Sequence, residues 1–220
     1  LYLDRCVCSI SSSADGAKLA VVNDGAYIYL STDSGASFSN AGNIVSAAGK
    51  KAWRSIAMST DGTKLAAVVN SGYIYTSSDS GATWTPRTGA PITTWSGVAS
   101  SSDGTKLAAV ANGYYVFTSA NSGSTWTMQM TSGVRSWSGV ASSSDGTKLA
   151  AVDQGGYIYT STNSGATWTT NSNSSGARNW AAITSSSDGT MLAAVVNGGY
   201  IYTSTCLLYT SPSPRDVEES

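Results

Sequence analysis

Aspartate is the residue that recurs in this sequence at a spacing able to build a reactive site. Histidine is absent from the 220 residues, so the commonest general base and the commonest metal ligand of proteins are both missing. The two glutamates, Glu218 and Glu219, stand at the C-terminus. Hydrolysis of a glycosidic bond needs two carboxyl groups, one as acid and one as nucleophile or base. The chemistry open to this chain therefore depends on whether any two aspartates are free of structural roles.

Most aspartates stand in two recurring phrases. The first phrase is Asp-Gly between short apolar runs, which signals a tight hairpin because glycine adopts positive φ without steric cost. Its aspartates follow one another at intervals of 46, 42, 42 and 43 residues: Asp15, Asp61, Asp103, Asp145 and Asp188. The second phrase is SSDSGATWT at 77–85, which returns in similar form at 31–39, 119–127 and 161–169. Its third position holds Asp33, Asp79, Asn121 and Asn163.

Asparagine in half of the copies decides the role of that third position. Asp and Asn side chains both accept hydrogen bonds from backbone amides two residues on, but only aspartate can act as a base. We therefore expect Asp79 to be a turn residue. Asp24 and Asp153 fall in another expected turn, between the second and third strands of a unit, which leaves Asp4 alone among the aspartates before residue 206. The sequence predicts no catalytic residue, no metal site and no cofactor.

The phrases belong to a unit of about 42 residues that contains four short strands. A late aromatic follows the Asp-Gly aspartate by 23 residues in the four complete units: Phe38, Trp84, Trp126 and Trp168. An early Trp precedes that aspartate by 8 residues in the last four units: Trp53, Trp95, Trp137 and Trp180. In the first unit Val7 holds this position. No stretch shows helical periodicity over ten residues. Four strands per repeat of this length is typical of a β-propeller blade.

We expect one all-β propeller domain over residues 1–205, with blades at about 7–39, 53–85, 95–127, 137–169 and 180–205. The third strands carry patterns such as YIY, apolar or aromatic on both faces, as expected for a sheet packed between neighbouring sheets. Five units are present, and we expect them to be part of a larger propeller. Open blade faces expose apolar surface and unpaired edges, so a truncated form is expected to self-associate.

The second phrase resembles the Asp-box, or BNR repeat, of sialidases, xyloglucanases, sortilin-type receptors and photosystem II assembly factors of the propeller kind. Ser77, Asp79, Gly81, Thr83 and Trp84 match the motif completely, and the copy at 31–39 has Phe38 in place of Trp. The resemblance covers roughly residues 7–205. It implies that the box is a hairpin between the third and fourth strands, on the outer edge and away from any active centre. It also implies that the first strand lines a central channel, whose entry lies on the ligand-binding face.

Cations stand two residues ahead of three early tryptophans. These are Lys51, Arg135 and Arg178, and Thr93 holds the position before Trp95. The residues predicted to form a ring at the channel mouth are Lys51, Trp53, Trp95, Arg135, Trp137, Arg178 and Trp180. Such a ring suits an anionic or sugar-bearing partner, because indoles stack on sugars and guanidinium groups hold carboxylate or sulfate. The alternative is that the tryptophans only pack between blades and that the cations are solvated.

Bulk properties exclude some partners and leave the compartment open. The net charge of −1, with 11% charged residues, provides no basic stripe for nucleic acid. Apolar runs of about five residues are far too short for a membrane span. The low charge and the Asn-x-Ser sequon at 173–175 weakly favour an extracellular or lumenal setting. Residues 206–220 interrupt the repeat, and CLLYTSPSPRD resembles a translated sequencing adapter, so we expect a non-native tail.

The expected function is a non-catalytic binding or scaffold module. Its ligand, a protein or glycan that can be anionic, would bind at the face that bears the variable connections between blades, where loops tolerate change. One alternative is a fragment of a glycoside hydrolase of the sialidase or xyloglucanase kind, with its catalytic acids elsewhere in a longer protein. A second alternative is a propeller similar to the photosystem assembly factors.

Overall fold

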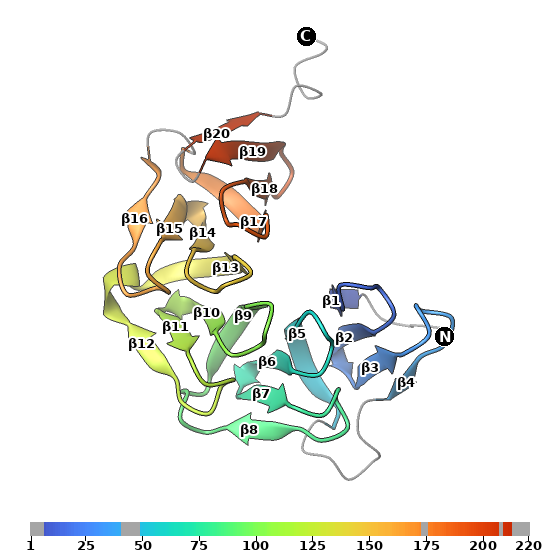
Figure 1. Ribbon diagram of the computed structural model, residues 1–220. Helices are drawn as coiled ribbons and strands as arrows, with labels where there is room; N and C mark the ends of the chain where they lie inside the picture. The colour runs from blue at the N-terminus through green and yellow to red at the C-terminus, as the bar shows by residue number, and fades with distance from the viewer. Residues whose placement is uncertain (1–6, 41–48, 173–175, 207–208, 213–220) are drawn as a thin grey trace.

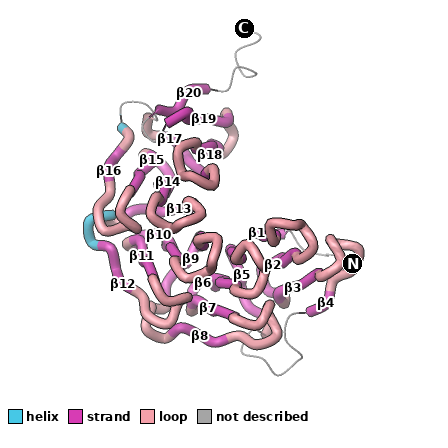
Figure 2. The backbone as a smooth tube through the Cα atoms, in the orientation of Figure 1, coloured by secondary structure: helices cyan, strands magenta, loops and turns pink. Residues whose placement is uncertain are grey.

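The computed structural model describes residues 7–40, 49–172, 176–206 and 209–212. The sequon at 173–175 and residues Asp4, Glu218 and Glu219 lie outside them. The described chain consists of β-strands joined by turns and loops, and its helical pieces are short, such as the 3-10 turn η1 (Met130–Ser132) (Figure 2). The first two units contain β1 (Val7–Ser12), β2 (Leu19–Ala26), β3 (Ile28–Ser31), β4 (Ser39–Asn40), β5 (Lys51–Met58), β6 (Leu65–Gly72), β7 (Ile74–Ser77) and β8 (Thr85–Arg87).

The remaining units repeat this order. The third unit contains β9 (Thr93–Ser100), β10 (Leu107–Tyr114), β11 (Val116–Ser119) and β12 (Thr127–Gln129). The fourth contains β13 (Arg135–Ser142), β14 (Leu149–Gly156), β15 (Ile158–Ser161) and β16 (Thr169–Thr170). The fifth contains β17 (Arg178–Ser185), β18 (Leu192–Val196), β19 (Ile201–Cys206) and β20 (Tyr209–Pro212).

Each unit is a four-stranded antiparallel meander, as the sequence predicts for a propeller blade. In the second unit β5 pairs with β6, β6 with β7, and β7 with β8. The far end of each second strand also pairs with the first strand of the next unit, as in the Asn70–Thr94 pair of β6 and β9. Figure 1 shows the five blades side by side in a curved arc, and the arc does not close into a ring.

The hydrophobic core is divided among the junctions between blades. The first cluster joins Val22 and Ile28 of the first unit to Trp53, Tyr75 and Trp84 of the second, all of them buried. Equivalent clusters fill the next three junctions. Each blade therefore buries its apolar faces against its neighbours, as in other repeat architectures.

The last strand departs from the repeat. In the fifth unit β20 pairs with β19, in the place that a fourth strand occupies in the other units. β20 comes from the segment 206–220 that the sequence predicts to be a non-native tail. The segment therefore supplies backbone pairing in this structure, and its origin stays a prediction.

Candidate functional site

The Asp-Gly turns join the first strand of each blade to the second. In the turn between β5 and β6, Asp61 Oδ1 accepts hydrogen bonds from Ser59 Oγ at 2.6 Å and from the Thr63 amide at 2.9 Å. Gly62 has a φ of +68°, which explains the glycine. These hydrogen bonds, the one from the Ser59 hydroxyl foremost, lower the pKa of Asp61 to about 2. The carboxylate is engaged in the turn, as the sequence predicts.

The second phrase is also a turn, with a wider reach than the sequence suggests. Asp79 Oδ1 accepts a hydrogen bond from the Thr83 amide at 2.8 Å, four residues on rather than two. Thr83 Oγ1 donates to Oδ2 at 2.5 Å, and Ser77 Oγ donates to Oδ1 at 2.7 Å. Burial raises the pKa of Asp79, and these hydrogen bonds outweigh it, so the pKa lies below its usual value. The turn role expected for Asp79 is confirmed, and the expected two-residue span is wrong.

Asparagine builds the same turn with one hydrogen bond reversed. The Thr125 amide donates to Asn121 Oδ1 at 2.9 Å, and Asn121 Nδ2 donates to Thr125 Oγ1 at 2.9 Å. Asn163 has the same geometry with Thr167. Because a neutral amide satisfies every contact that Asp79 makes, no charge is needed at this position.

Both sets of turns lie at one edge of the arc, which we call the aspartate edge. It contains four lysines, and each donates a hydrogen bond to the carbonyl oxygen of the Asp-Gly aspartate in the next blade. Lys64 Nζ, for example, donates to the Asp103 carbonyl oxygen at 2.9 Å. The edge carries Lys18, Lys64, Lys106 and Lys148 with Asp15, Asp33, Asp61, Asp79, Asp103, Asp145 and Asp188. The lysines link the blades at this edge.

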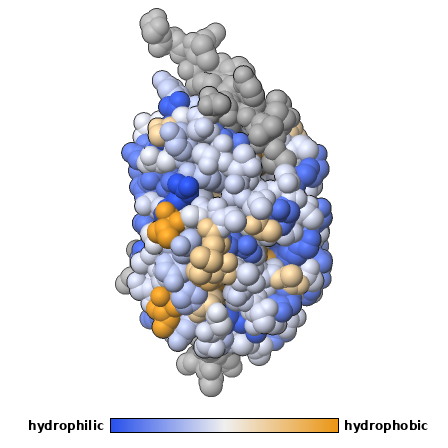
Figure 3. All heavy atoms as spheres, turned by 90° about the vertical axis from the view of Figure 1, so that its left-hand side faces the viewer, coloured by the Kyte–Doolittle hydropathy of each residue, from blue (hydrophilic) through white to orange (hydrophobic). Residues whose placement is uncertain are grey.

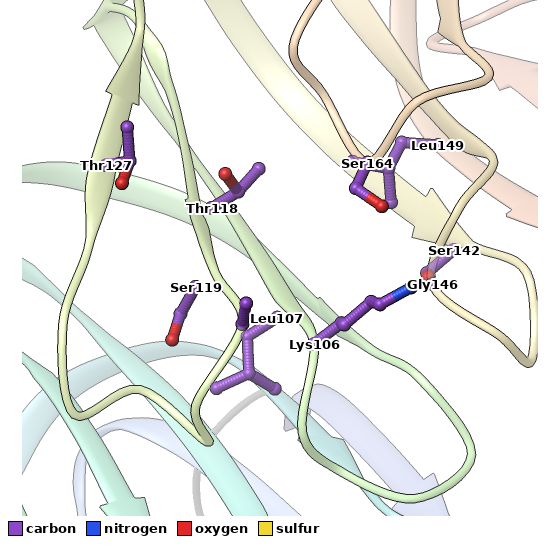
Figure 4. A pocket seen from close by; sticks show the side chains of 10 residues that line it. Lys106, Leu107, Thr118, Ser119, Thr127, Ser142, Gly146, Leu149 and Ser164 are labelled. Atoms are coloured by element: carbon purple, nitrogen blue, oxygen red, sulfur yellow. The ribbon is translucent and has the colours of Figure 1, made fainter.

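A cavity of about 130 Å³ lies at this edge, between the third and fourth blades, and Figure 4 shows the side chains that line it. Lys106 and Leu107 line it from one blade, and Leu149 and Ser164 line it from the next. A similar cavity of about 250 Å³ lies between the first and second blades. Lys106 Nζ donates to the Asp145 carbonyl at 2.8 Å, so its charged group is already used in the junction. We assign these cavities to blade packing.

A groove of about 330 Å³ runs along the concave side of the arc, where the first strands converge. Ser96, Gly97, Ser138 and Gly139 line it, and they lie on the first strands, which the Asp-box resemblance predicts to line a channel. A Cβ on Gly97 would lie 3.5 Å from the Cα of Gly139, an ordinary van der Waals contact, and 3.2 Å from Val110 Cγ2, which is tighter. Small residues at these positions therefore lie in contact with the neighbouring first strand, as expected for a channel wall.

Arg54 is the charged residue in the described lining of this groove. It occupies a β-bulge in β5, the position that Ser96 and Ser138 hold in later blades. Ser96 Oγ donates to the Trp137 carbonyl at 2.6 Å and so joins two blades. Arg54 instead pairs with Asp24 at 3.4 Å, with 39% of its side chain exposed. Arg54 was not among the predicted site residues, although its departure from the serine of the repeat was a usable signal.

The early tryptophans are interior residues. Trp53, Trp95, Trp137 and Trp180 are between 0 and 1% exposed. Each packs edge-on against an aromatic ring of its own blade, such as Trp53 on Tyr75 at 5.3 Å between ring centroids. An indole without exposed surface cannot stack on a ligand. The expectation of exposed indoles at the channel mouth is therefore corrected, and inter-blade packing, the alternative considered from the sequence, accounts for these residues.

The cations ahead of the tryptophans stack on tyrosines instead. Arg135 lies over the Tyr159 ring at 4.3 Å, Arg178 over Tyr202 at 4.7 Å and Lys51 over Tyr75 at 5.2 Å. Lys50 lies over Tyr27 of the preceding blade at 5.5 Å. Thr93 has Phe117 at the ring position and provides no cation. A ring face that attracts a cation also holds its side chain in place at the start of the first strand.

Arg135 is the most constrained cation. Its Nε donates to the Ser132 carbonyl at 3.1 Å, and Nη1 lies 3.9 Å from Asp153. Burial raises the pKa of Asp153, and Arg135 opposes that rise. We call the edge with the starts of the first strands the basic face. It carries Lys50, Lys51, Arg54, Arg135 and Arg178 against Asp24 and Asp153.

The two edges of the arc thus differ in charge. The basic face has five cations against two aspartates, whereas the aspartate edge has four lysines against seven aspartates. In the part of the chain that the structure describes, no three potential metal ligands gather, and no helix is long and apolar enough to cross a membrane. The outer side with β12 and β16 is mostly hydrophilic, with separate apolar spots (Figure 3).

Comparisons with known proteins show similarity at the level of fold. No protein-family model matches the chain, and no curated protein matches its sequence. A structure of YCF48 bound to D1 peptide superposes with a TM-score of 0.69 at 16% identity, covering 92% of this chain and 66% of that one. The GH74 enzyme of Niastella koreensis gives 0.70 at 21% identity, with 92% and 30% covered. A nidogen/laminin complex gives 0.72 at 12% identity, with 90% and 75% covered.

The identities lie below the level at which a shared function follows from a shared fold. The chain spans about two thirds of the YCF48 chain and less than a third of the GH74 enzyme. Both enzymes and non-enzymatic binding proteins use this architecture. The chain is an all-β propeller arc.

Proposed function

We propose that the chain is a non-catalytic binding module that takes an anionic segment of a protein partner on its basic face. The main support for this proposal is that charge is segregated between the two edges. Five cations gather near the starts of the first strands, while the aspartates of the opposite edge are engaged in turns. Complementary charge steers association and selects partners. Arg54, Lys51 and Arg178 are the cations best placed for contact with a ligand.

The character of the groove supports binding rather than hydrolysis. Its described lining holds no carboxylate, so a pair of catalytic acids would have to come from residues beyond that lining. Two of the similar structures, the YCF48–D1 peptide and the nidogen/laminin complexes, are complexes with protein partners. They favour a peptide or protein ligand over a glycan, and an anionic glycan is the second candidate because the same guanidinium groups would bind sulfate.

A paired substitution tests this proposal. Binding of a labelled polyglutamate peptide and of a labelled sulfated glycan is measured by fluorescence anisotropy at low salt. Arg54→Gln with Arg178→Gln removes two charges from the basic face, and Lys64→Gln with Lys106→Gln removes two from the aspartate edge. We expect the first pair to weaken peptide binding about tenfold or more and the second to change it less than about twofold.

Three results would contradict the proposal. They are equal loss in both pairs, binding of the glycan but not of the peptide, and binding that is insensitive to salt between about 0.05 and 0.5 M. Circular dichroism of each variant confirms that the fold is retained, so that a loss of binding is not a loss of structure.

A further inference from the structure

Every junction between consecutive blades joins the same two faces. The face that a blade turns toward the next one, its trailing face, presents an alanine, a valine and an Ile or Val from its second and third strands, such as Ala20, Val22 and Ile28. The face of the next blade, its leading face, covers them with the early Trp and the third-strand aromatic, such as Trp53 and Tyr75. The described chain contains four such junctions.

The trailing face of the fifth blade has the same composition, and no described residue covers it. Ile201 is 51% exposed, whereas its equivalents in the four preceding blades are 0% exposed: Ile28, Ile74, Val116 and Ile158. Val195 is partly exposed, and its equivalents are also 0% exposed: Val22, Val68, Val110 and Val152. The apolar face that is buried in the four described junctions is therefore exposed on the fifth blade.

The backbone carbonyl of Gly199 indicates which side chain would pack on this face. Trp95 Nε1 donates to the Gly72 carbonyl at 3.1 Å, and Trp180 Nε1 donates to the Gly156 carbonyl at 3.2 Å. The fifth blade has Gly199 at this position, whereas Ala26 and Tyr114 hold it in the two junctions whose Trp has no partner among the described residues. The Gly199 carbonyl is therefore an acceptor of the kind that receives an indole N–H.

A series of backbone hydrogen bonds that links each blade to the next also ends at the fifth blade. The Thr60 amide donates to the Ser102 carbonyl, the Ser102 amide to Ser144, and the Ser144 amide to Ser187, each at 2.7 Å. The next donor is the Ser187 amide, for which the described chain offers no acceptor. Met191 stands where the other blades have a lysine that bonds to the following Asp-Gly carbonyl. The junction would therefore form without that lysine contact.

We propose that the trailing face of the fifth blade docks a further unit of this same repeat, one with a Trp eight residues ahead of its Asp-Gly pair. Continuity with the four existing junctions identifies the occupant. A second whole copy of the chain fits poorly, because its later blades would follow the same curve toward the first blade of the arc (Figure 1). One added unit requires only the space beside β18 and β19.

Two extended versions of the chain test this docking. In the long version a copy of residues 79–132 replaces residues 206–220, which completes the fifth blade and adds one unit with the repeat in phase. In the short version a copy of residues 79–92 completes the fifth blade only. Hydrogen exchange of the segment 192–204 is measured by mass spectrometry. We expect exchange about tenfold slower or more in the long version, because the added unit buries Ile201 and Val195.

Two further variants separate docking from mere extension. In the added unit, alanine in place of the residue copied from Trp95 should remove the protection of 192–204. Alanine in place of the residue copied from Met128, which lies on an outer strand, should leave it. Equal exchange in the long and short versions would overturn the proposal, and so would protection that survives loss of the copied Trp.

Discussion

Replacing Asp79 with alanine and with asparagine tests whether the recurring SxDxGxT turn needs a charge. The alanine variant loses three hydrogen bonds, from Ser77 Oγ, the Thr83 amide and Thr83 Oγ1. At about 0.5–1.5 kcal/mol net for each bond, and toward the low end because Asp79 is exposed, the loss is about 1.5–2 kcal/mol in total. The asparagine variant keeps all three contacts in the geometry of Asn121, so it should cost less than about 0.5 kcal/mol.

Urea unfolding followed by tryptophan fluorescence measures both changes, since Trp84 ends the same turn. The midpoints should differ while the slope with urea stays constant, because the surface exposed on unfolding is unchanged. Ser78→Ala, an exposed neighbour, is the matched control and should leave the midpoint in place. An asparagine variant as unstable as the alanine variant would refute the reasoning, because it would show that the carboxylate charge is required.

Four other outcomes follow from the structure. The pKa values of Asp33, Asp61, Asp103 and Asp188 are lowered to about 2 by turn hydrogen bonds, so the stability they confer is full above about pH 4 and should be lost as pH falls toward 2 in acid titrations of unfolding. Lys64→Met removes the bond to the Asp103 carbonyl and should lower the urea midpoint by the equivalent of about 0.5–1.5 kcal/mol. Trp95→Phe should cost about 0.5–1.5 kcal/mol more than Trp137→Phe in the same assay, because only Trp95 has an acceptor for its N–H. Light scattering of the full chain should show association that rises with concentration, because large apolar side chains are exposed, and a strictly monomeric chain would contradict this expectation.

The repeat made the fold predictable from the sequence. The Asp-Gly pairs and fixed internal spacings located the hairpins, and the structure places strands on both sides of each pair, as between β5 and β6. Asn121 and Asn163 predicted a turn role for Asp79, and the structure places Asp79 and Asn121 in equivalent turns with the same partners. These signals are local, so that the sequence alone carries them.

The site was less predictable because it depends on which neighbouring side chains each residue meets along the strand. Trp53 and Lys51 are two residues apart in β5, yet the indole is buried in a junction while the ammonium lies over Tyr75. Sequence spacing placed the cations and the tryptophans together but gave no sign of the buried tyrosine between them. Arg54 was missed because it is a single departure from a serine position, visible only once the bulge brings it into the groove.

The footprint of an acidic peptide on the intact chain tests the central claim most directly. Hydrogen exchange is compared with and without saturating polyglutamate peptide at low salt. The account predicts slower exchange at the starts of β5, β13 and β17 and along the groove, with no change in the Asp-Gly turns. Protection confined to the aspartate edge, or an unchanged pattern at saturation, would contradict it.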